Sequence, residues 1–151
     1  MKILLVSDSH GRKEELNDLI NSENWDYVLF AGDGLRDLGC SIYDPKFIYV
    51  RGNCDFFAQD EPITQTIFVG SYKILLTHGD YYKVKLGLEN LHAFAVSKGY
   101  NVVCYGHTHE KLQKEIDGVK YINPGSFKTG NYAEIYIRDN QLSLNIKNIN
   151  C

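Results

Sequence analysis

The sequence is built on short aliphatic runs, each followed within a few residues by a glycine-flanked polar cluster. The runs Lys2–Ser7, Tyr27–Ala31 and Phe47–Val50 are the first three. Because nearly every position in such a run is apolar, we expect strands that are covered on both faces. Between the first two runs, apolar residues recur at helical spacing, which predicts a helix over Arg12–Asn21. This order of elements indicates an α/β beginning.

The rest of the chain is predicted to be mostly β-structure. The runs Ile63–Val69 and Tyr72–Thr77 flank Gly70-Ser71, a signal for a two-residue hairpin turn. A second helix is predicted over Lys85–Lys98, with Gly99 as its C-terminal cap, whereas the short segment around residues 35–43 gives no clear pattern. The further predicted strands are Asn101–Tyr105, Leu112–Ile116, Val119–Ile122, Tyr132–Ile137 and Leu142–Ile149.

Composition narrows the class of protein. The 151 residues fit one domain over 1–151, and no linker or internal repeat divides them. A net charge of −3 argues against general binding of duplex nucleic acid. No apolar stretch approaches the length of a membrane span, and Asp8 ends the first run too early for a signal peptide. The four cysteines match no zinc pattern, so we expect a reduced, cytoplasmic protein.

Metal-ligand side chains follow five of the predicted strands. Ligands at the carboxyl ends of several strands would meet in one crevice, where α/β sheets bind their ligands. Glycines accompany almost every one, which suits tight turns and close backbone approach to an ion. The seven residues are Asp8, His10, Asp33, Asn53, His78, His107 and His109.

The chemistry of these residues indicates two ions rather than one. Seven oxygen and nitrogen ligands are too many for one tetrahedral zinc, and the set is too rich in imidazole for Ca²⁺ or Mg²⁺ alone. Two ions of the manganese-to-zinc group would suit it, sharing one bridging carboxylate. Asp33 stands between two glycines and is the natural bridge.

At this point the residues resemble a family, the calcineurin-like metallophosphoesterases. The compact length resembles their small bacterial and archaeal phosphodiesterase branch, to which a retromer subunit of similar fold is distantly related. The similarity covers residues 2 to about 127 and includes the turn Asn123-Pro124-Gly125-Ser126. The motifs that carry it are Asp8-Ser9-His10-Gly11, Gly32-Asp33-Gly34, Gly52-Asn53-Cys54-Asp55, His78-Gly79-Asp80 and Gly106-His107-Thr108-His109.

The resemblance implies roles for the ligand residues. One divalent metal would be held by Asp8, His10 and His109, and the other by Asn53, His78 and His107, with Asp33 bridging. Manganese is expected first, with nickel, zinc, iron, cobalt or magnesium as alternatives. The expected catalytic residues are Asp33, Asn53 and His107.

The resemblance also implies a fold and a reaction. The fold would be a four-layer α-β-β-α sandwich of two mixed β-sheets, with the site at one edge. The reaction would be hydrolysis of a phosphoester, with a small or nucleotide-like phosphodiester as the expected substrate, by in-line attack of a metal-bridging hydroxide. The physiological substrate is left open, and self-association is an open expectation for the β-rich half.

The sequence departs from the larger family members after the motif asparagine. Those commonly carry a histidine that helps to protonate the leaving group, and Cys54 stands there instead. A neutral thiol is a poor acid at neutral pH. Asp55, Asp80 or solvent could substitute, so good leaving groups are favoured. Arg51 is a further candidate for contact with substrate.

Two other interpretations remain beside the enzyme. A catalytically weak protein-binding scaffold of the same fold would have lost ligand residues, yet all seven are present. A metal-storage protein fits the open, glycine-rich rim less well than catalysis does. His92 lies in a predicted helix outside every motif, so its substitution is expected to be nearly silent.

Overall fold

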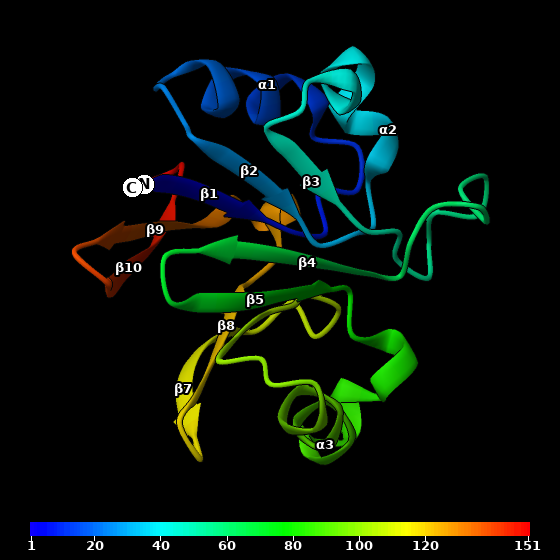
Figure 1. The fold of residues 1–151 in the computed structure, drawn as a ribbon. Helices are drawn as coiled ribbons and strands as arrows, with labels where there is room; N and C mark the ends of the chain where they lie inside the picture. Colours follow the sequence, from blue (N-terminus) through cyan, green and yellow to red (C-terminus); the bar gives the residue numbers. More distant parts are fainter.

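A computed structural model describes all residues 1–151, and its strands form two five-stranded sheets (Figure 1). Sheet A has the order β10-β9-β1-β2-β3, in which β1, β2 and β3 are parallel. Its strands are β1 (Lys2–Val6), β2 (Tyr27–Phe30), β3 (Phe47–Tyr49), β9 (Asn131–Arg138) and β10 (Gln141–Asn148). Sheet B has the order β4-β5-β6-β8-β7, in which β5, β6 and β8 are parallel. Its strands are β4 (Thr64–Val69), β5 (Tyr72–Thr77), β6 (Val102–Cys104), β7 (Lys111–Ile116) and β8 (Val119–Pro124).

Helices cover the outer face of each sheet, and the two inner faces pack together (Figure 1). This is the four-layer sandwich of two mixed sheets that the resemblance predicts. The helices are α1 (Lys13–Asn21) and α2 (Leu35–Leu38) over sheet A, and α3 (Glu89–Ser97) over sheet B. None of them is long and apolar enough to cross a membrane.

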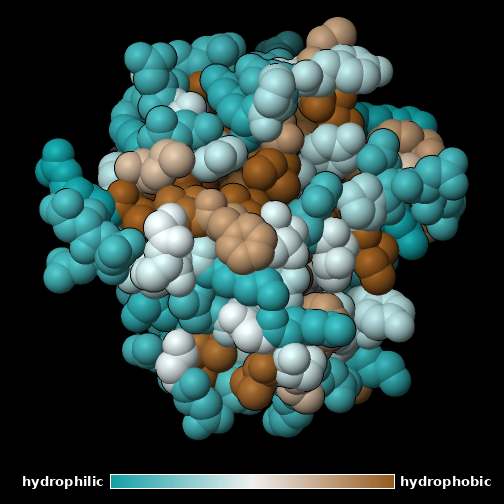
Figure 2. All heavy atoms as spheres, in the orientation of Figure 1, coloured by the Kyte–Doolittle hydropathy of each residue, from teal (hydrophilic) through white to brown (hydrophobic).

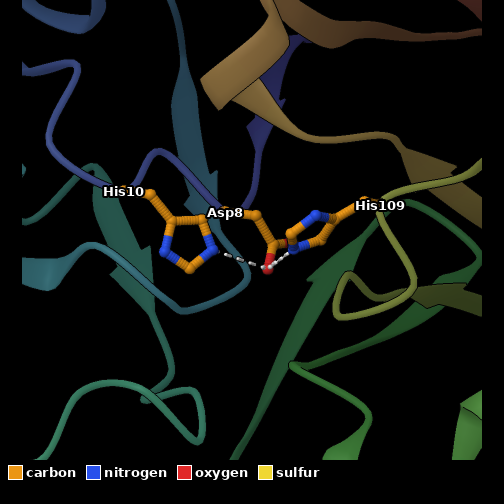
Figure 3. Close-up of side chains that lie close together, drawn as sticks. All are labelled: Asp8, His10 and His109. Atoms are coloured by element: carbon orange, nitrogen blue, oxygen red, sulfur yellow. Dashed lines mark ion pairs between the residues drawn. The ribbon is translucent and has the colours of Figure 1, made fainter.

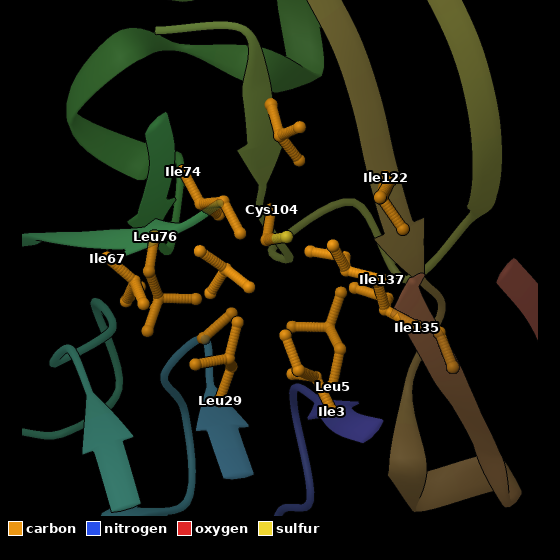
Figure 4. Close-up of a cluster of buried hydrophobic side chains, with 14 of the residues drawn as sticks. Ile3, Leu5, Leu29, Ile67, Ile74, Leu76, Cys104, Ile122, Ile135 and Ile137 are labelled. Atoms are coloured by element: carbon orange, nitrogen blue, oxygen red, sulfur yellow. The ribbon is translucent and has the colours of Figure 1, made fainter. Parts of the chain in front are cut away.

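The period of two along each strand explains why the runs are continuously apolar. Ile3 and Leu5 of β1 point into the core between the sheets, while Leu4 and Val6 point to α1 and α2. All four are fully buried. The inter-sheet core is almost purely aliphatic and joins residues from β1, β2, β4, β5, β6, β8 and β9 (Figure 4). Each such aliphatic side chain contributes ~1.5–3 kcal/mol on burial.

The predicted strands all exist, with ends that differ by one or two residues. Gly70 lies in the left-handed region with φ 57°, and Val69 pairs with Tyr72, so the two-residue hairpin is confirmed. Gly99 has φ 74° and its N–H donates to the Val96 carbonyl, as expected of a helix cap.

The prediction for the second helix is wrong at its start. A 3-10 turn occupies Val84–Leu86, and α3 begins only at Glu89. Gly87 separates them with φ 128° and ψ 174°, a backbone conformation that no helix contains. The unclear segment after β2 proves to be α2 followed by a 3-10 turn over Gly39–Tyr43.

The face of the molecule drawn in Figure 2 is mostly hydrophilic. Figure 2 shows polar side chains over most of one face, with apolar side chains reaching the surface between the two sheets. Several of the large exposed apolar side chains lie outside the sheets: Phe56 and Phe57 in the loop between β3 and β4, and Tyr81 and Leu86 in 3-10 turns after β5.

Candidate metal centre

The seven predicted ligand residues meet where parallel strands of both sheets end. The loops after β1, β2 and β3 come from sheet A, and those after β5 and β6 come from sheet B. Main-chain hydrogen bonds join neighbouring loops: the Asp8 N–H donates to Gly32 at 2.9 Å, and the Gly106 N–H to His78 at 3.0 Å. The site therefore lies across the junction of the two sheets.

Left-handed backbone conformations are concentrated in these loops. A residue other than glycine rarely adopts positive φ, because its Cβ then approaches the following carbonyl group. Such strain persists where the surrounding structure enforces it, and it clusters at functional sites. Five of the ligand residues have positive φ, namely Asp8 (55°), His10 (42°), Asp33 (61°), His107 (68°) and His109 (61°).

Glycine is required where the loops touch. A Cβ on Gly52 would overlap the Asp33 carboxylate. A Cβ on Gly106 would overlap the Ser7 hydroxyl and lie 2.7 Å from Asp8 Oδ2. Two of the motif glycines are therefore explained by close approach to acidic ligand residues.

The first cluster consists of Asp8, His10 and His109 (Figure 3). Both imidazoles point toward one carboxylate oxygen, Asp8 Oδ1, with His109 Nε2 at 3.2 Å and His10 Nε2 at 3.7 Å. Asp8 is fully buried, yet Oδ1 has no hydrogen-bond partner, and neither does His10 Nε2. Buried atoms of this kind are costly unless a cation satisfies them.

The second cluster consists of Asp33, His78 and His107. His78 Nδ1 lies 2.7 Å from the Ala31 carbonyl oxygen, which can only accept, so Nδ1 carries the hydrogen. Nε2 of the neutral ring then presents its lone pair to Asp33 Oδ2 at 3.2 Å and His107 Nδ1 at 3.2 Å. Asn53 Oδ1 lies 2.9 Å from the same nitrogen.

These donor sets fit divalent metals. Several electron-pair donors face one another with too few hydrogens between them, and a cation resolves that mismatch. In each cluster the ligand atoms lie within 4.8 Å of one another. Imidazole and carboxylate together suit manganese, iron, nickel, cobalt and zinc, and a carbonyl-oriented second nitrogen is typical of metal-binding histidine.

Asp33 connects the two clusters. Its Oδ2 atom lies 3.2 Å from His78 Nε2 and 3.8 Å from His10 Nε2, so one carboxylate faces a histidine of each set. Its other oxygen accepts the Cys54 N–H at 2.8 Å, which fixes the carboxylate plane. This is the position that a bridging ligand would occupy.

The electrostatics of the centre couple Asp33 to His78. Burial, the largest influence, raises the pKa of Asp33, but the hydrogen bond and charge of His78 and the Cys54 N–H outweigh it and lower this pKa to about 2. For His78, burial lowers the pKa, while Asp33 and Asp8 outweigh it and raise the pKa overall. Burial and the charge of His78 lower the pKa of His107. The metal-free centre therefore holds a proton on His78 more tightly than free imidazole does.

Asp55 has a different environment from the one expected. It is 3% exposed, and its two oxygens accept four main-chain N–H groups, at 2.8–3.1 Å, from Asp33, Gly34, Leu35 and Gly52. A carboxylate saturated in this way is not free to protonate a leaving group. Asp55 is instead a positioning residue that ties the loops after β2 and β3 together.

Sequence reasoning missed further positioning residues. Asp37 Oδ2 accepts from the Ser9 hydroxyl at 2.5 Å and the Gly11 N–H at 2.9 Å, which holds the first ligand loop against α2. The Ser126 hydroxyl donates to the Asp8 carbonyl at 2.8 Å. Asn123 donates to the Gly106 carbonyl at 3.0 Å, so the end of β8 and the turn after it support two ligand loops. The only signal in the sequence was that the turn Asn123-Pro124-Gly125-Ser126 lies within the region that resembles the family.

The remaining residues singled out from the sequence lie at the edge of the candidate metal centre or away from it. Cys54 is exposed as a residue, but its thiol is partly shielded from water. This shielding and the charge of Asp33 raise the pKa of the thiol, so it stays neutral. Arg51 is partly buried, with its Nε atom unpaired. His92 lies outside the candidate metal centre, and its ring nitrogens form hydrogen bonds with Tyr121 and Asp117.

Comparison with known proteins identifies the class to which this fold and site belong. The calcineurin-like phosphoesterase superfamily domain matches residues 1–137. The chain belongs to this superfamily.

Named relatives agree with that assignment. The chain is 35% identical over 130 residues to the probable metallophosphoesterase YsnB of Bacillus subtilis, covering 85% of this chain and 76% of the relative. It is 30% identical to the phosphodiesterase YfcE of Escherichia coli, covering 94% and 89%. The structure of wild-type Vps29 from Entamoeba histolytica complexed with Zn²⁺ superposes with a TM-score of 0.80 at 22% identity, covering 99% and 98%. That last similarity shows the fold alone.

Proposed function

We propose that this chain is a phosphodiesterase that depends on two divalent metal ions. The position of Asp33 carries the proposal, because its Oδ2 atom faces both His10 and His78 and so joins two clusters that are each suited to one ion. Asp8, His10 and His109 would hold one ion, and Asn53, His78 and His107 the other. When bound, the ions would lower the pKa of a water and neutralise charge on the phosphoryl oxygens.

The residues of the chain would keep this centre rigid and correctly protonated. The Ala31 carbonyl holds His78 in the tautomer whose Nε2 faces the cluster. The Cys54 N–H orients Asp33, and the Ser7 hydroxyl at 2.5 Å and the His107 N–H at 3.1 Å occupy Asp8 Oδ2, which leaves Oδ1 as the free ligand oxygen. Such a preorganised centre suits transition-state stabilisation.

The residues around the leaving group favour certain substrates. Cys54 keeps its proton at neutral pH because its pKa is raised, and a thiol of that pKa protonates a leaving group weakly. Asp55 is fully engaged with main-chain N–H groups. We therefore expect diesters with good leaving groups to be hydrolysed faster than alkyl monoesters.

The test is hydrolysis of a chromogenic aryl phosphodiester by chelator-stripped protein, with Mn²⁺, Ni²⁺, Zn²⁺ or Mg²⁺ added back. The matching aryl monoester is assayed beside it. Turnover of the diester that requires metal and disappears in Asp33→Asn supports the proposal. Absence of turnover with every metal, in folded protein that binds metal, would favour the scaffold interpretation over the enzyme.

A further inference from the structure

A hollow of about 320 Å³ opens beside the candidate metal centre. Two candidate ligand residues, His10 and Asp33, line it together with Arg36 and the neighbouring phenylalanines Phe56 and Phe57. A molecule in this hollow would therefore contact the metal centre and this second set of side chains together.

The two phenylalanines are unusually exposed for their type. Phe56 is 76% exposed and Phe57 is 54% exposed, next to each other in the loop between β3 and β4. Figure 1 shows this loop extending outward beyond the edge of the sandwich. Adjacent aromatic side chains left in water beside a polar centre form a surface that a ligand can cover.

The loop is nevertheless held firmly at its base. Asp55, directly before Phe56, accepts four main-chain N–H groups. Ala58, directly after Phe57, is 6% exposed and packs in the core under α1 and α2. The two rings are therefore presented by anchored backbone, which reduces the entropy lost when a ligand binds.

Arg36 lies against one of these aromatic rings. Its guanidinium carbon lies 4.3 Å from the centroid of the Phe57 ring, a cation–π arrangement. No carboxylate lies within ion-pair distance of it in the structure, so its charge is not neutralised by the protein. Arginine planes and phenyl faces are both surfaces on which planar rings stack.

We propose that Arg36, Phe56 and Phe57 form a subsite for a planar aromatic substituent of the phosphodiester. A nucleobase and a simple aryl group share this chemistry. The inference rests on the proposed function, because it assumes that the phosphate binds at the adjacent centre. It deepens that function by naming the substrate class.

Binding measurements test the subsite without relying on turnover. Titration calorimetry with Mn²⁺-loaded protein compares phenyl phosphate with methyl phosphate, and adenosine 5′-monophosphate with ribose 5-phosphate. We expect the aromatic member of a pair to bind about tenfold more tightly, the scale of stacking on one aromatic side chain. The pair with the larger ratio identifies the ring, a nucleobase or a simple aryl group.

Three variants locate the preference. In Phe57→Ala and in Arg36→Ala, the ratio within each pair should fall toward one. Both members of a pair carry the same phosphate group. A general loss of phosphate binding in Arg36→Ala therefore cancels in the ratio. Phe68→Ala is the matched control, because Phe68 is 70% exposed on β4, outside the hollow, and its loss should leave the ratio unchanged.

The outcomes separate the two proposals. A wild-type ratio near one, or a ratio that survives Phe57→Ala, overturns the subsite while leaving metal-dependent turnover intact. Ring-dependent binding without turnover of any diester overturns the proposed function alone. Failure of all four phosphates to bind Mn²⁺-loaded protein overturns both.

Discussion

Asp33 Oδ2 lies 3.2 Å from His78 Nε2, and this contact joins the carboxyl end of β2 in sheet A to that of β5 in sheet B. The Asp33 side chain is 3% exposed and that of His78 is 1% exposed, so their interaction is shielded from water. Because neither sheet supplies a complete metal cluster by itself, the centre forms only when both sheets pack together. The same contact also lowers the pKa of Asp33 and raises the pKa of His78 in the metal-free centre.

The first prediction concerns Asp33→Asn. The amide can still accept the Cys54 N–H, so the fold should be retained, but the negative charge between the clusters is lost. We expect the loss of turnover to exceed about a hundredfold, the upper range for residues that only support metal ligands. Steady-state rates and metal content measure it.

Asp18→Asn is the control for that variant, because Asp18 is exposed on α1, outside the candidate metal centre. Its rate and metal content should match those of the wild type. Near-normal turnover in Asp33→Asn would contradict the bridging role.

The second prediction concerns Asp55→Ala. Four main-chain N–H groups lose their acceptor, and each buried unsatisfied donor costs about 1–3 kcal/mol, partly recovered by water. We expect a loss of about 3 kcal/mol or more in the free energy of unfolding, with weaker metal binding. Urea denaturation in the presence of chelator measures the first effect. Asp60→Ala, at an exposed position nearby, should change stability by less than about 0.5 kcal/mol.

The third prediction compares two glycines at which alanine would be unfavourable for different reasons. At one the new methyl group has no room, and at the other the backbone would be strained. In Gly106→Ala the new methyl group would overlap the Ser7 hydroxyl and crowd Asp8, so we expect loss of metal binding and about 1–3 kcal/mol of destabilisation. Gly118 has φ 79° and open space around its Cβ position. Gly118→Ala should therefore cost about 1–2 kcal/mol through backbone strain while metal binding is unchanged. Equal metal affinity in the two variants would refute the steric argument.

The convergence of the candidate ligand residues could be predicted because each follows a buried strand in the sequence. Parallel strands place their carboxyl ends together, so local pattern and topology together brought Asp8, Asp33 and His78 to one edge. The strands themselves were visible because both faces of the central ones are buried, which leaves an uninterrupted apolar run.

The positioning residues could not be predicted in the same way. Asp37 and Asp55 look like ordinary loop or helix carboxylates in sequence, and their roles depend on N–H groups from other loops. The start of α3 was also missed, because apolar residues before Gly87 continue the helical spacing while the backbone does not. Tertiary contacts decide such cases.

The fourth prediction concerns pH. The pKa of Asp33 is lowered to about 2 in the folded metal-free protein, below its ordinary value of 3.8. The folded state therefore favours the ionised form of Asp33. The stabilisation that this carboxylate adds to the free energy of unfolding is present above pH 3.8 and is lost as the pH falls toward 2. The pKa of His78 is raised above 6.5 in the folded state. The stabilisation from its protonated ring is therefore present below pH 6.5 and is lost as the pH rises through this raised pKa.

Metal binding should release the proton of His78, because only the neutral ring is a ligand. We expect metal affinity to rise with pH up to the raised pKa of His78 and then to level off. Calorimetry in two buffers of different ionisation enthalpy counts the released protons. Asp33→Asn removes a main cause of the raised pKa, so fewer protons should be released near neutral pH, and an unchanged count would contradict the coupling.

The fifth prediction concerns His92→Ala, which we still expect to be nearly silent for turnover but not for stability. His92 Nδ1 lies 2.6 Å from the hydroxyl of Tyr121, a fully buried residue, and Nε2 lies 2.9 Å from Asp117. Removal of the imidazole leaves the tyrosine hydroxyl without this partner and frees α3 from the turn between β7 and β8. We expect the free energy of unfolding to fall by about 1–3 kcal/mol while metal-dependent turnover at 25 °C is unchanged, because no ligand residue contacts His92. His92→Gln, which can still bond the hydroxyl, should recover part of the loss in urea denaturation, and an equal loss in both variants would show that ring packing, not the hydrogen bond, stabilises this position.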